Sequence, residues 1–363
     1  MVIEKEVISF EQVKKGYVLK NDMSGVGAYT LVPSIIKTFL SNPSLDDYSK
    51  CMILFCRIDG KVAARSMFFP SRVRIGEDIV RAQGGSSLFA LPEYRHLTIG
   101  LDLMRYPLET KEYPLIVYAG ISKMAVPMYK ALRFSIFSSP EYWQPRKSKF
   151  LFQHFGAKGI VLKVLSLIGD LAIKPLLGTA RLINKDSTKQ FTVSRLTTVP
   201  VWVDDIVKND PHKYSEYHDH LWMQWTIDNN FFAKQYEEQG FYEVKKDDEI
   251  VGYFLLKIRN LDLPEHNIDQ VVFGTVYEWG TVDDSILNEF DIYCLAERLL
   301  PKCVDIFNVS TPDTLVNSKI KRLFMIRHGE TYIVTKDVSK KYPDSKEQNN
   351  WRIRMGYSDV PFY

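Results

Sequence analysis

Short apolar runs separated by turn residues predict a mixed β-sheet in the first half of the chain. The run Met52–Arg57 is followed by Asp59-Gly60 and a second apolar run, which is the pattern of a β-hairpin. A strand is expected near Ile79–Leu91, and a helix from about Leu97 to Tyr106. The continuous apolar run Leu115–Tyr118 indicates a strand that is buried on both faces.

A further helix is expected over Met124–Leu132. Ser122 is a suitable N-cap for this helix, and Pro127 is compatible with it only near the first turn. Antiparallel strands followed by alternating strands and helices indicate an α+β or mixed-sheet fold.

The second half of the chain repeats this order of elements with little residue identity. Its expected elements are a hairpin around Asp247-Asp248, a strand over Val271–Trp279, a helix over Ser285–Leu299, a strand over Val304–Val309 and a helix near Leu315–Phe324. We interpret the repetition as a tandem duplication.

Residues 147–185 differ in character from both halves. The stretch Lys158–Gly178 is apolar, but Lys163, Asp170 and Lys174 within it argue against a helix that spans a membrane. An amphipathic connecting helix that packs on one domain is the favoured interpretation. The alternative is a helix that lies weakly on a membrane surface, and it is supported by the basic residues Arg146, Lys147, Lys149, Lys158, Arg181 and Lys185.

The length of 363 residues fits two domains. We expect an N-terminal domain over residues 1–146, a basic amphipathic linker helix over 147–190 and a C-terminal domain over 191–363. The net charge of +3 is too small to indicate a nucleic-acid partner. The four cysteines form no disulfide framework, and the charges in Met1–Glu6 argue against an export signal, so a cytoplasmic protein is expected.

Two pieces of the first half carry the candidate chemistry. Leu88–Gly100 is an apolar strand that breaks at Pro92 and runs directly into a helix start. Ala125–Phe134 is a helix that ends in an aromatic residue. A strand that stops at a helix N-terminus directs several backbone N–H groups at one place, and such a place attracts phosphates.

Together these pieces resemble the GNAT acyltransferases. In that family a loop of the form Arg/Gln-x-x-Gly-x-Gly/Ala holds the pyrophosphate of an acyl-coenzyme A; here Arg95 and Gly100 fill its first and last positions, and Thr98 replaces the middle glycine. The resemblance implies that Leu88–Leu91 lie along the pantetheine arm, a form of strand addition. The cofactor-binding residues that it implies are Phe89, Ala90, Leu91, Arg95, His96, Leu97, Thr98, Ile99 and Gly100.

The helical piece follows the family pattern Ala-x-x-Leu-Tyr-x-x-Leu-Gly-Phe, with Arg133 where glycine is usual. The resemblance implies that Tyr129 protonates the leaving coenzyme A thiolate, because a phenol can be held where charge develops. The alternative is a tyrosine that packs its ring in the core with the hydroxyl at the rim.

The glutamate base that many family members carry on or near the fourth strand is missing. The strand offers Gln83, Ser86 and Ser87 instead. Asp22, near the turn Gly25-Val-Gly27, and Asp78 are speculative substitutes, although solvated surface carboxylates are the default. In the second half the strand carboxylate is Glu278, but Thr281–Ser285 bring acids where a diphosphate would lie. That half is expected to shape an acceptor groove without binding coenzyme A.

Two further motifs contain histidine, but neither indicates a functional site. Leu323–Thr331 resembles the phosphohistidine motif of histidine phosphatases, but too little chain follows it, so a turn that leads into a strand at Tyr332 is expected. His218 and His220 have no third ligand nearby, so no metal site is expected.

The resemblance implies an α/β (α+β) protein of two GNAT-like domains, each a mixed, mostly antiparallel sheet flanked by helices. The expected reaction is direct transfer of an acyl group, from acetyl-CoA or another acyl-CoA, to an amine of a sugar, an amino acid or another small molecule. One alternative is a tRNA-dependent aminoacyltransferase of the peptidoglycan-bridge type. The other is a non-catalytic binding protein with the same fold.

Overall fold

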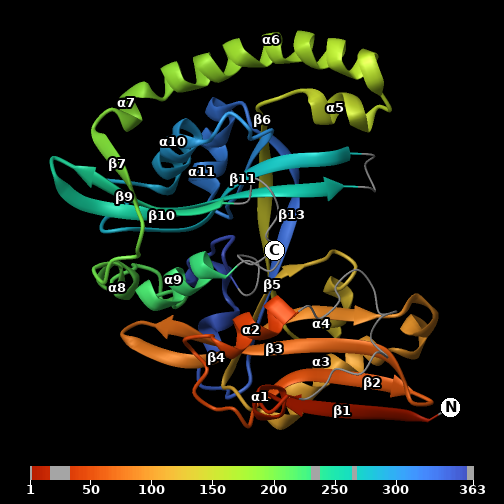
Figure 1. The fold of residues 1–363 in the computed structure, drawn as a ribbon. Helices are drawn as coiled ribbons and strands as arrows, with labels where there is room; N and C mark the ends of the chain where they lie inside the picture. The colour runs from red at the N-terminus through yellow and green to blue at the C-terminus, as the bar shows by residue number, and fades with distance from the viewer. Residues whose placement is uncertain (1, 17–32, 230–237, 264–267, 358–363) are drawn as a thin grey trace.

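The computed structural model describes residues 2–16, 33–229, 238–263 and 268–357 (Figure 1). Asp22 and Gly25–Gly27 lie outside the described residues. The strands are β1 Ile3–Ser9, β2 Cys51–Ile58, β3 Lys61–Ile75, β4 Asp78–Ala90, β5 Leu115–Ile121, β6 Ser135–Pro145, β7 Phe191–Leu196, β8 Tyr214–Glu216, β9 Glu238–Lys246, β10 Glu249–Leu263, β11 Ile268–Thr281, β12 Ile306–Ser310 and β13 Ile326–Asp337. The α-helices are α1 Phe10–Lys14, α2 Pro33–Leu40, α3 Ile99–Thr110, α4 Val126–Ala131, α5 Lys149–His154, α6 Gly159–Ile183, α7 Lys185–Thr188, α8 Val203–Lys208, α9 His220–Asp228, α10 Glu289–Leu299 and α11 Thr314–Lys319. The 3₁₀ helices are η2 Pro92–Leu97, η4 Ile320–Leu323, η5 Pro343–Lys346 and η6 Gln348–Asn350.

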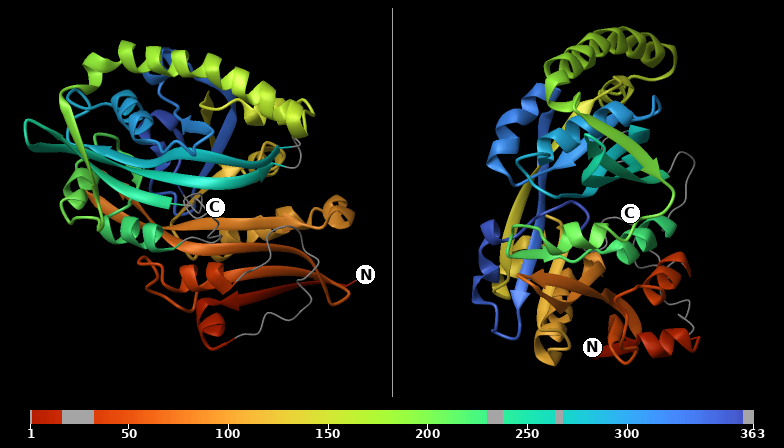
Figure 2. Two further views of the ribbon diagram at one scale, coloured as in Figure 1. Left: turned by 45° about the horizontal axis from the view of Figure 1, so that its top comes forward. Right: turned by 90° about the vertical axis from the view of Figure 1, so that its left-hand side faces the viewer.

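The strands form one mixed sheet of 13 strands. Its order is β1-β2-β3-β4-β5-β13-β6-β12-β11-β10-β9-β7, and β8 pairs with β3 outside this path. The pairs β4/β5 and β11/β12 are parallel, and the other pairs are antiparallel. Helices flank the sheet (Figure 2). The predicted mixed α/β fold, with mostly antiparallel strands, is confirmed.

Turn residues set both long hairpins. Asp59 and Gly60 have φ of 48° and 79°, and Asp247 and Asp248 have φ of 51° and 65°. Aspartate and glycine tolerate this left-handed region better than other residues do, and two such residues in a row produce the tight turn that matches strand twist. Both predicted hairpins, β2–β3 and β9–β10, are confirmed.

The two halves exchange strands at the centre of the sheet. β13, near the end of the chain, lies between β5 and β6 of the first half. β6 in turn pairs with β12 of the second half, over Glu141–Pro145 and Ile306–Ser310. The sheet therefore runs through both halves without a break, and the division at residues 146 and 190 stays a prediction.

A buried cluster of charged side chains also joins the halves. Glu216 lies on β8, which pairs with β3 of the first half, whereas Glu278 lies on β11 of the second half. His218 lies between them, with Nδ1 2.5 Å from Glu278 and Nε2 3.4 Å from Glu216. Arg354 contacts both Glu278 at 3.0 Å and Asp210 at 2.9 Å. Burial lowers the pKa of His218, but the two glutamates outweigh it and raise that pKa above its usual value.

Two predictions from local sequence patterns, the N-cap at Ser122 and the turn at His328, are wrong. α4 begins at Val126 behind Ala125, and the Ser122 carbonyl accepts the Ala125 N–H, so Ser122 belongs to the preceding turn and is not the N-cap. Pro127 stands in the first turn of α4, as expected. His328 lies within β13 rather than in a turn before it, because this segment pairs with β6.

α6 runs across the C-terminal half, at the opposite end of the molecule from β1 (Figures 1 and 2). Its side chains and cap contact α5 and η4: Ser148 Oγ donates to Asp170 at 2.8 Å, and Asn184 Nδ2 donates to the carbonyl of Arg322 at 3.2 Å. Within the part of the chain that the structure covers, no helix is long and apolar enough to cross a membrane.

One buried carboxyl predicts a pH dependence of stability. Burial raises the pKa of Glu289, at the start of α10, from 4.5 to about 7, against a hydrogen bond from the Tyr293 hydroxyl. Above pH 7 the folded protein must ionise this group in its buried site. One pKa unit corresponds to about 1.4 kcal/mol. The free energy of unfolding of Glu289→Gln, relative to that of the unmodified protein, is therefore expected to rise by roughly 3 kcal/mol as the pH rises from 4.5 to 7.

Urea unfolding of both proteins at several pH values measures this difference. The exposed Glu77→Gln is the control, for which the difference stays near zero. A difference for Glu289→Gln that does not change with pH contradicts the assignment.

Candidate active site

The candidate site lies where the parallel strands β4 and β5 separate. β4 and β5 pair at Ala82 with Leu115 and at Gln83 with Ile116. Both strands then continue, β4 to Ala90 and β5 to Ile121, without further pairing to each other. The space between them opens toward the start of α3.

Two adjacent glycines fix the place where the strands part. A Cβ atom on Gly84 would lie 2.3 Å from the Phe69 ring, and one on Gly85 would lie 2.7 Å from the Tyr118 ring. These distances leave no room for a side chain, so both positions require glycine. The Tyr118 ring, on β5, thereby packs directly on the backbone of β4 at Gly85 and belongs to the hydrophobic core on that face of the sheet.

A β-bulge follows immediately in β4. Met67 of β3 pairs with Ser86, but Arg65 pairs with Phe89, so β4 has one residue more than β3 here, and Ser87 has φ of 53°. A bulge bends its strand and redirects side chains. It turns the end of β4 away from β5.

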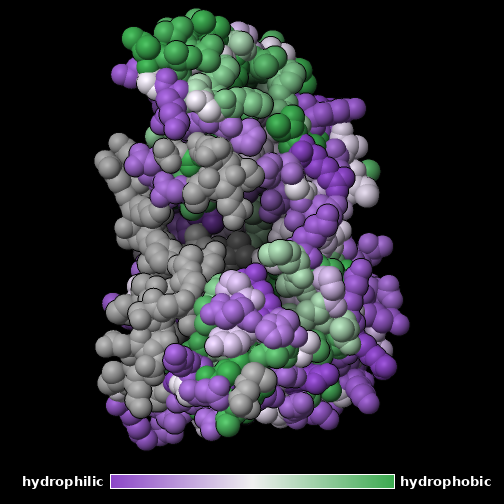
Figure 3. Space-filling view, turned by 90° about the vertical axis from the view of Figure 1, so that its right-hand side faces the viewer, coloured by the Kyte–Doolittle hydropathy of each residue, from purple (hydrophilic) through white to green (hydrophobic). Residues whose placement is uncertain are grey.

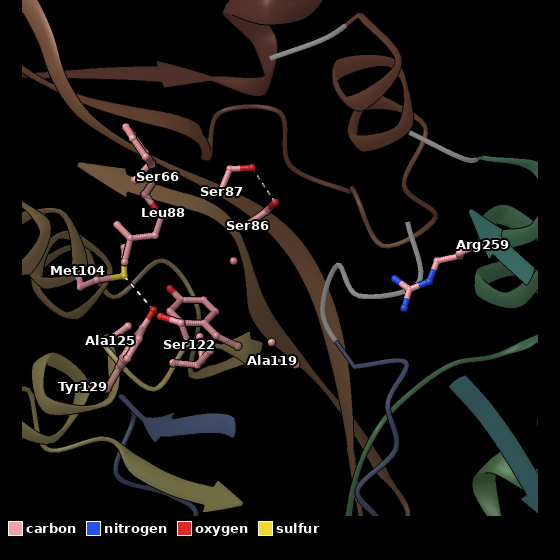
Figure 4. Close-up of a pocket in the computed structure, with 15 residues that line it drawn as sticks. Ser66, Ser86, Ser87, Leu88, Met104, Ala119, Ser122, Ala125, Tyr129 and Arg259 are labelled. Atoms are coloured by element: carbon pink, nitrogen blue, oxygen red, sulfur yellow. Dashed lines mark hydrogen bonds between the residues drawn. The ribbon is translucent and has the colours of Figure 1, made fainter. Parts of the chain in front are cut away.

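The resulting cleft has a volume of about 410 Å³. Its lining residues are Ser66, Gly85, Ser86, Ser87, Leu88, Phe89, Met104, Tyr118, Ala119, Gly120, Ile121, Ser122, Ala125, Tyr129 and Arg259. Tyr129 and Met104 lie on one side, and Arg259 approaches from the side of β10 (Figure 4). An elongated, largely apolar ligand fits such a cleft.

Tyr129 packs its ring in the core and directs its hydroxyl to the cleft. Its ring is 2% exposed and packs edge-on against Phe134, with 5.2 Å between ring centroids. Its hydroxyl forms part of the cleft wall and donates to the Met104 Sδ at 3.5 Å. A thioether is a weak acceptor, so this hydroxyl can be drawn to a stronger one. Its role as a proton donor stays a prediction.

The start of α3 offers free donors near the end of β4, although none of residues 92–100 lines the cleft itself. Thr98 has the left-handed φ of 58°, and its carbonyl accepts the N–H groups of Leu101 and Asp102. The N–H groups of Ile99 and Gly100 form no hydrogen bond to any described residue, and no side chain caps this helix. Such a helix start binds anions. These residues therefore fit a diphosphate.

Gly100 leaves room for a ligand. A Cβ atom there would contact only the Met128 Sδ, at 4.0 Å, so packing does not require glycine at this position. Arg95 is exposed, donates from Nε to the Ala90 carbonyl at 3.1 Å and lies over the Phe89 ring. Its guanidinium therefore stays close to the mouth of the cleft.

The other residues predicted from the motif differ in their placement. Phe89 lines the cleft, whereas Ala90 and Leu91 lie beyond it, where the Leu91 N–H donates to the Ala63 carbonyl. Leu97 and Ile99 pack into the hydrophobic core, so Ile99 can reach a ligand only through its backbone. The exposed His96 lies near the helix start and outside the cleft.

A second cavity of about 420 Å³ adjoins the first. The two share Ala119–Ser122 and Arg259 as lining. The second half contributes much of the remaining wall, from β10, β11, β12 and β13, including the Arg354 of the buried charged cluster. His328 lines this cavity and stacks on Trp143, with 3.3 Å between ring centroids.

Glu141 is the functional candidate that sequence reasoning missed. It lies on β6, and its carboxyl lines the second cavity. Burial raises its pKa, although the charge of Arg259 partly offsets that effect. No motif marks Glu141, because only the exchange of β6 and β13 brings it beside residues far away in sequence. Asp78, by contrast, is exposed at the opposite end of β4 and lines neither cavity.

The corresponding positions of the second half are occupied by the chain itself. Asn288 caps α10 by accepting the Asp291 N–H, and Asp291 accepts the Asn288 N–H in return. At the bulge of β11, the Tyr277 carbonyl accepts the N–H of Gly356. Glu278, wholly buried, is held by His218 and Arg354 and lines neither cavity.

Solved structures share this fold. A GCN5-related N-acetyltransferase from Anabaena variabilis has a TM-score of 0.55 at 11% identity, covering 93% of this chain and 73% of that one. A Saccharomyces cerevisiae N-myristoyltransferase with bound myristoyl-CoA has a TM-score of 0.57 at 14% identity, covering 93% and 79%. A probable N-acyltransferase from Enterococcus faecalis has a TM-score of 0.54 at 11% identity, covering 93% and 73%.

No protein-family model and no curated protein matches the sequence. The structural similarity is therefore the evidence for a relationship, and it shows the fold alone. The resemblance to the GNAT acyltransferases is confirmed as a shared GNAT fold.

Substitution of the glycines tests the packing that forms the cleft. Gly85→Ala places a methyl group against the Tyr118 ring, so we expect a loss of about 1–3 kcal/mol in the free energy of unfolding. Gly100→Ala is the matched control and is expected to change that free energy by no more than about 0.5 kcal/mol, because its new methyl group meets no close atom. Urea unfolding measures both, and equal effects would refute the packing account.

Proposed function

We propose that this protein is an acyl-coenzyme A-dependent N-acyltransferase. The observation that carries the proposal is the uncapped start of α3 beside a cleft that contains a tyrosine hydroxyl and leads into a second cavity. A diphosphate, an extended thiol arm and an acceptor each have a suitable place in this arrangement. The shared fold of acetyl- and myristoyltransferases supports the same conclusion.

The first half would hold the acyl-coenzyme A. The backbone N–H groups of Ile99 and Gly100 would bind its diphosphate, with Arg95 nearby, and Leu88 and Phe89 would line its pantetheine arm. The co-substrate supplies an activated thioester carbonyl. We propose acetyl-CoA as the simplest donor.

Two side chains would move the protons. The Glu141 carboxylate would accept a proton from the acceptor amine, since burial makes it a stronger base than an exposed glutamate. The Tyr129 hydroxyl would donate a proton to the leaving sulfur. Attack by the amine would then be direct, with no covalent intermediate on the protein.

The second cavity would hold the acceptor. Its size suits a small molecule such as an amino sugar or an amino acid, and Glu141 offers the acceptor amine a carboxylate in a wall that also carries Lys123, Arg259 and Arg354. The four cysteines are free, which agrees with a cytoplasmic location for the protein.

Binding of the diphosphate at the start of α3 predicts that a larger side chain at Gly100 weakens the binding of acetyl-CoA. Calorimetric titration with acetyl-CoA is expected to detect binding by the unmodified protein, and Gly100→Leu is expected to raise the Kd at least tenfold, because the side chain covers the donors of the helix start. Gly178→Leu, on α6 in open space, is the matched control and should keep the Kd. Equal Kd values for all three proteins would overturn the assignment of the diphosphate site.

The chemical step predicts effects of Tyr129 and Glu141. Tyr129→Phe and Glu141→Gln are each expected to lower kcat about 10²-fold while the Kd for acetyl-CoA stays unchanged. Because Glu141 must be ionised to accept a proton, activity should fall as the pH drops through its raised pKa, and Glu141→Gln should remove this dependence.

Matched controls are Tyr106→Phe, whose hydroxyl bonds Glu112 outside the cleft, and the exposed Glu77→Gln. Unchanged kcat in Tyr129→Phe would remove Tyr129 from the mechanism. Absence of acyl-CoA binding together with retention on aminoacyl-tRNA would favour the tRNA-dependent alternative. Binding without turnover of any amine would favour the non-catalytic one.

A further inference from the structure

A continuous apolar stripe covers the outer face of α6. Ile160, Val164, Leu167, Ile168, Leu171 and Leu182 are 52–78% exposed. At about 100° per residue, these side chains fall within an arc of about 100°, which is densest from Ile160 to Leu171 and continues past Pro175 and Gly178 to Leu182. Water-exposed aliphatic side chains are normal one by one, but a contiguous patch marks an interaction surface.

The helix cannot rotate to bury this stripe. Its opposite side, which includes Ile173 and Ala180, faces the protein. Ser148 holds Asp170 through its N–H at 2.7 Å and its hydroxyl at 2.8 Å, and a Cβ atom on Gly169 would lie 2.5 Å from the Ser148 Oγ. At the other end, Arg181 pairs with the buried Glu297 at 2.9 Å. The stripe is therefore fixed outward.

Basic residues follow one edge of the stripe. Lys163 and Lys174 are both exposed and lie about three turns apart, so they project on the same side of the helix. Lys149 and Lys158 add exposed positive charge before the helix start. The one acidic residue of α6, Asp170, is held by Ser148 on the inner side. The outward surface is therefore apolar and positive, with no negative charge from the helix.

This combination matches one kind of partner. A helix with an apolar face and flanking lysines lies in the interfacial plane of a membrane, with its aliphatic side chains among the acyl chains and its ammonium groups at anionic headgroups. Figure 3 shows apolar surface gathered at the end of the molecule where α6 lies. Phe155, between α5 and α6, is a further exposed apolar side chain. A surface for another protein would not need the positive edge.

We propose that α6 attaches this protein to the surface of an anionic membrane, with the helix parallel to the bilayer. The helix does not span the bilayer. At about 1.5 Å per residue, its 25 residues give a contact about 37 Å long. The attachment is independent of the cleft, which lies in the first half of the sheet, so it can be tested without reference to catalysis.

Vesicle sedimentation of the full chain tests the proposal. Vesicles of phosphatidylcholine with about 30% phosphatidylserine should bind the protein at least tenfold more tightly than pure phosphatidylcholine, and about 0.5 M salt should remove most of the difference. Leu167→Gln/Leu171→Gln should lower binding at least tenfold, because both side chains leave the acyl region. Lys163→Glu/Lys174→Glu should abolish the preference for anionic lipid.

Matched controls change the same residue types elsewhere on the surface. Leu315→Gln/Val282→Gln and Lys61→Glu/Lys302→Glu should bind vesicles as the unmodified protein does. Failure of the unmodified protein to bind anionic vesicles overturns the proposal, as does binding that the α6 variants leave unchanged. Self-association in light scattering that Leu167→Gln/Leu171→Gln dissolves, without vesicle binding, would assign the stripe to a contact between copies and also overturn it.

Discussion

The packing of the Tyr118 ring on the bare backbone of Gly85 is the contact on which the site depends. It lies just beyond Gln83, the last residue of β4 that pairs with β5, and the bulge at Ser87 follows it. An ordinary parallel pair would have closed this space with hydrogen bonds. Where the strands part, a cleft lies between the end of β4, β5 and Tyr129, and it shares a wall with a second cavity formed largely by the second half.

The exchange of β6 and β13 determines what lies at the inner end of that cleft. It brings Glu141 of the first half beside Arg259 and His328 of the second, and the two cavities share a wall as a result. The two halves differ at the corresponding positions: the start of α3 is open, whereas the start of α10 is capped by Asn288, and Gly356 donates its N–H to the Tyr277 carbonyl at the bulge of β11. Under the proposed function, the open cleft of the first half would be the acyl-donor site, and the second half would contribute the wall of the acceptor site.

Much of the fold could be predicted from the sequence, because its signals are local. Asp59-Gly60 and Asp247-Asp248 adopt the backbone angles that these residue types favour, and the strand–helix junction before Gly100 follows from Pro92. Glu141 could not be predicted, since its significance comes from pairing between strands far apart in sequence. The outward stripe of α6 is similar: the sequence shows an apolar, basic segment, but only the contacts of Ser148 and Arg181 show which face is exposed.

The most direct measurement of the central claim is a crystal structure of the protein with bound acetyl-CoA. The account predicts the diphosphate on the N–H groups of Ile99 and Gly100, and the pantetheine arm between β4 and β5 with its sulfur near the Tyr129 hydroxyl. A ligand bound to the second half instead, or a cleft that stays empty at saturating acetyl-CoA, would contradict it.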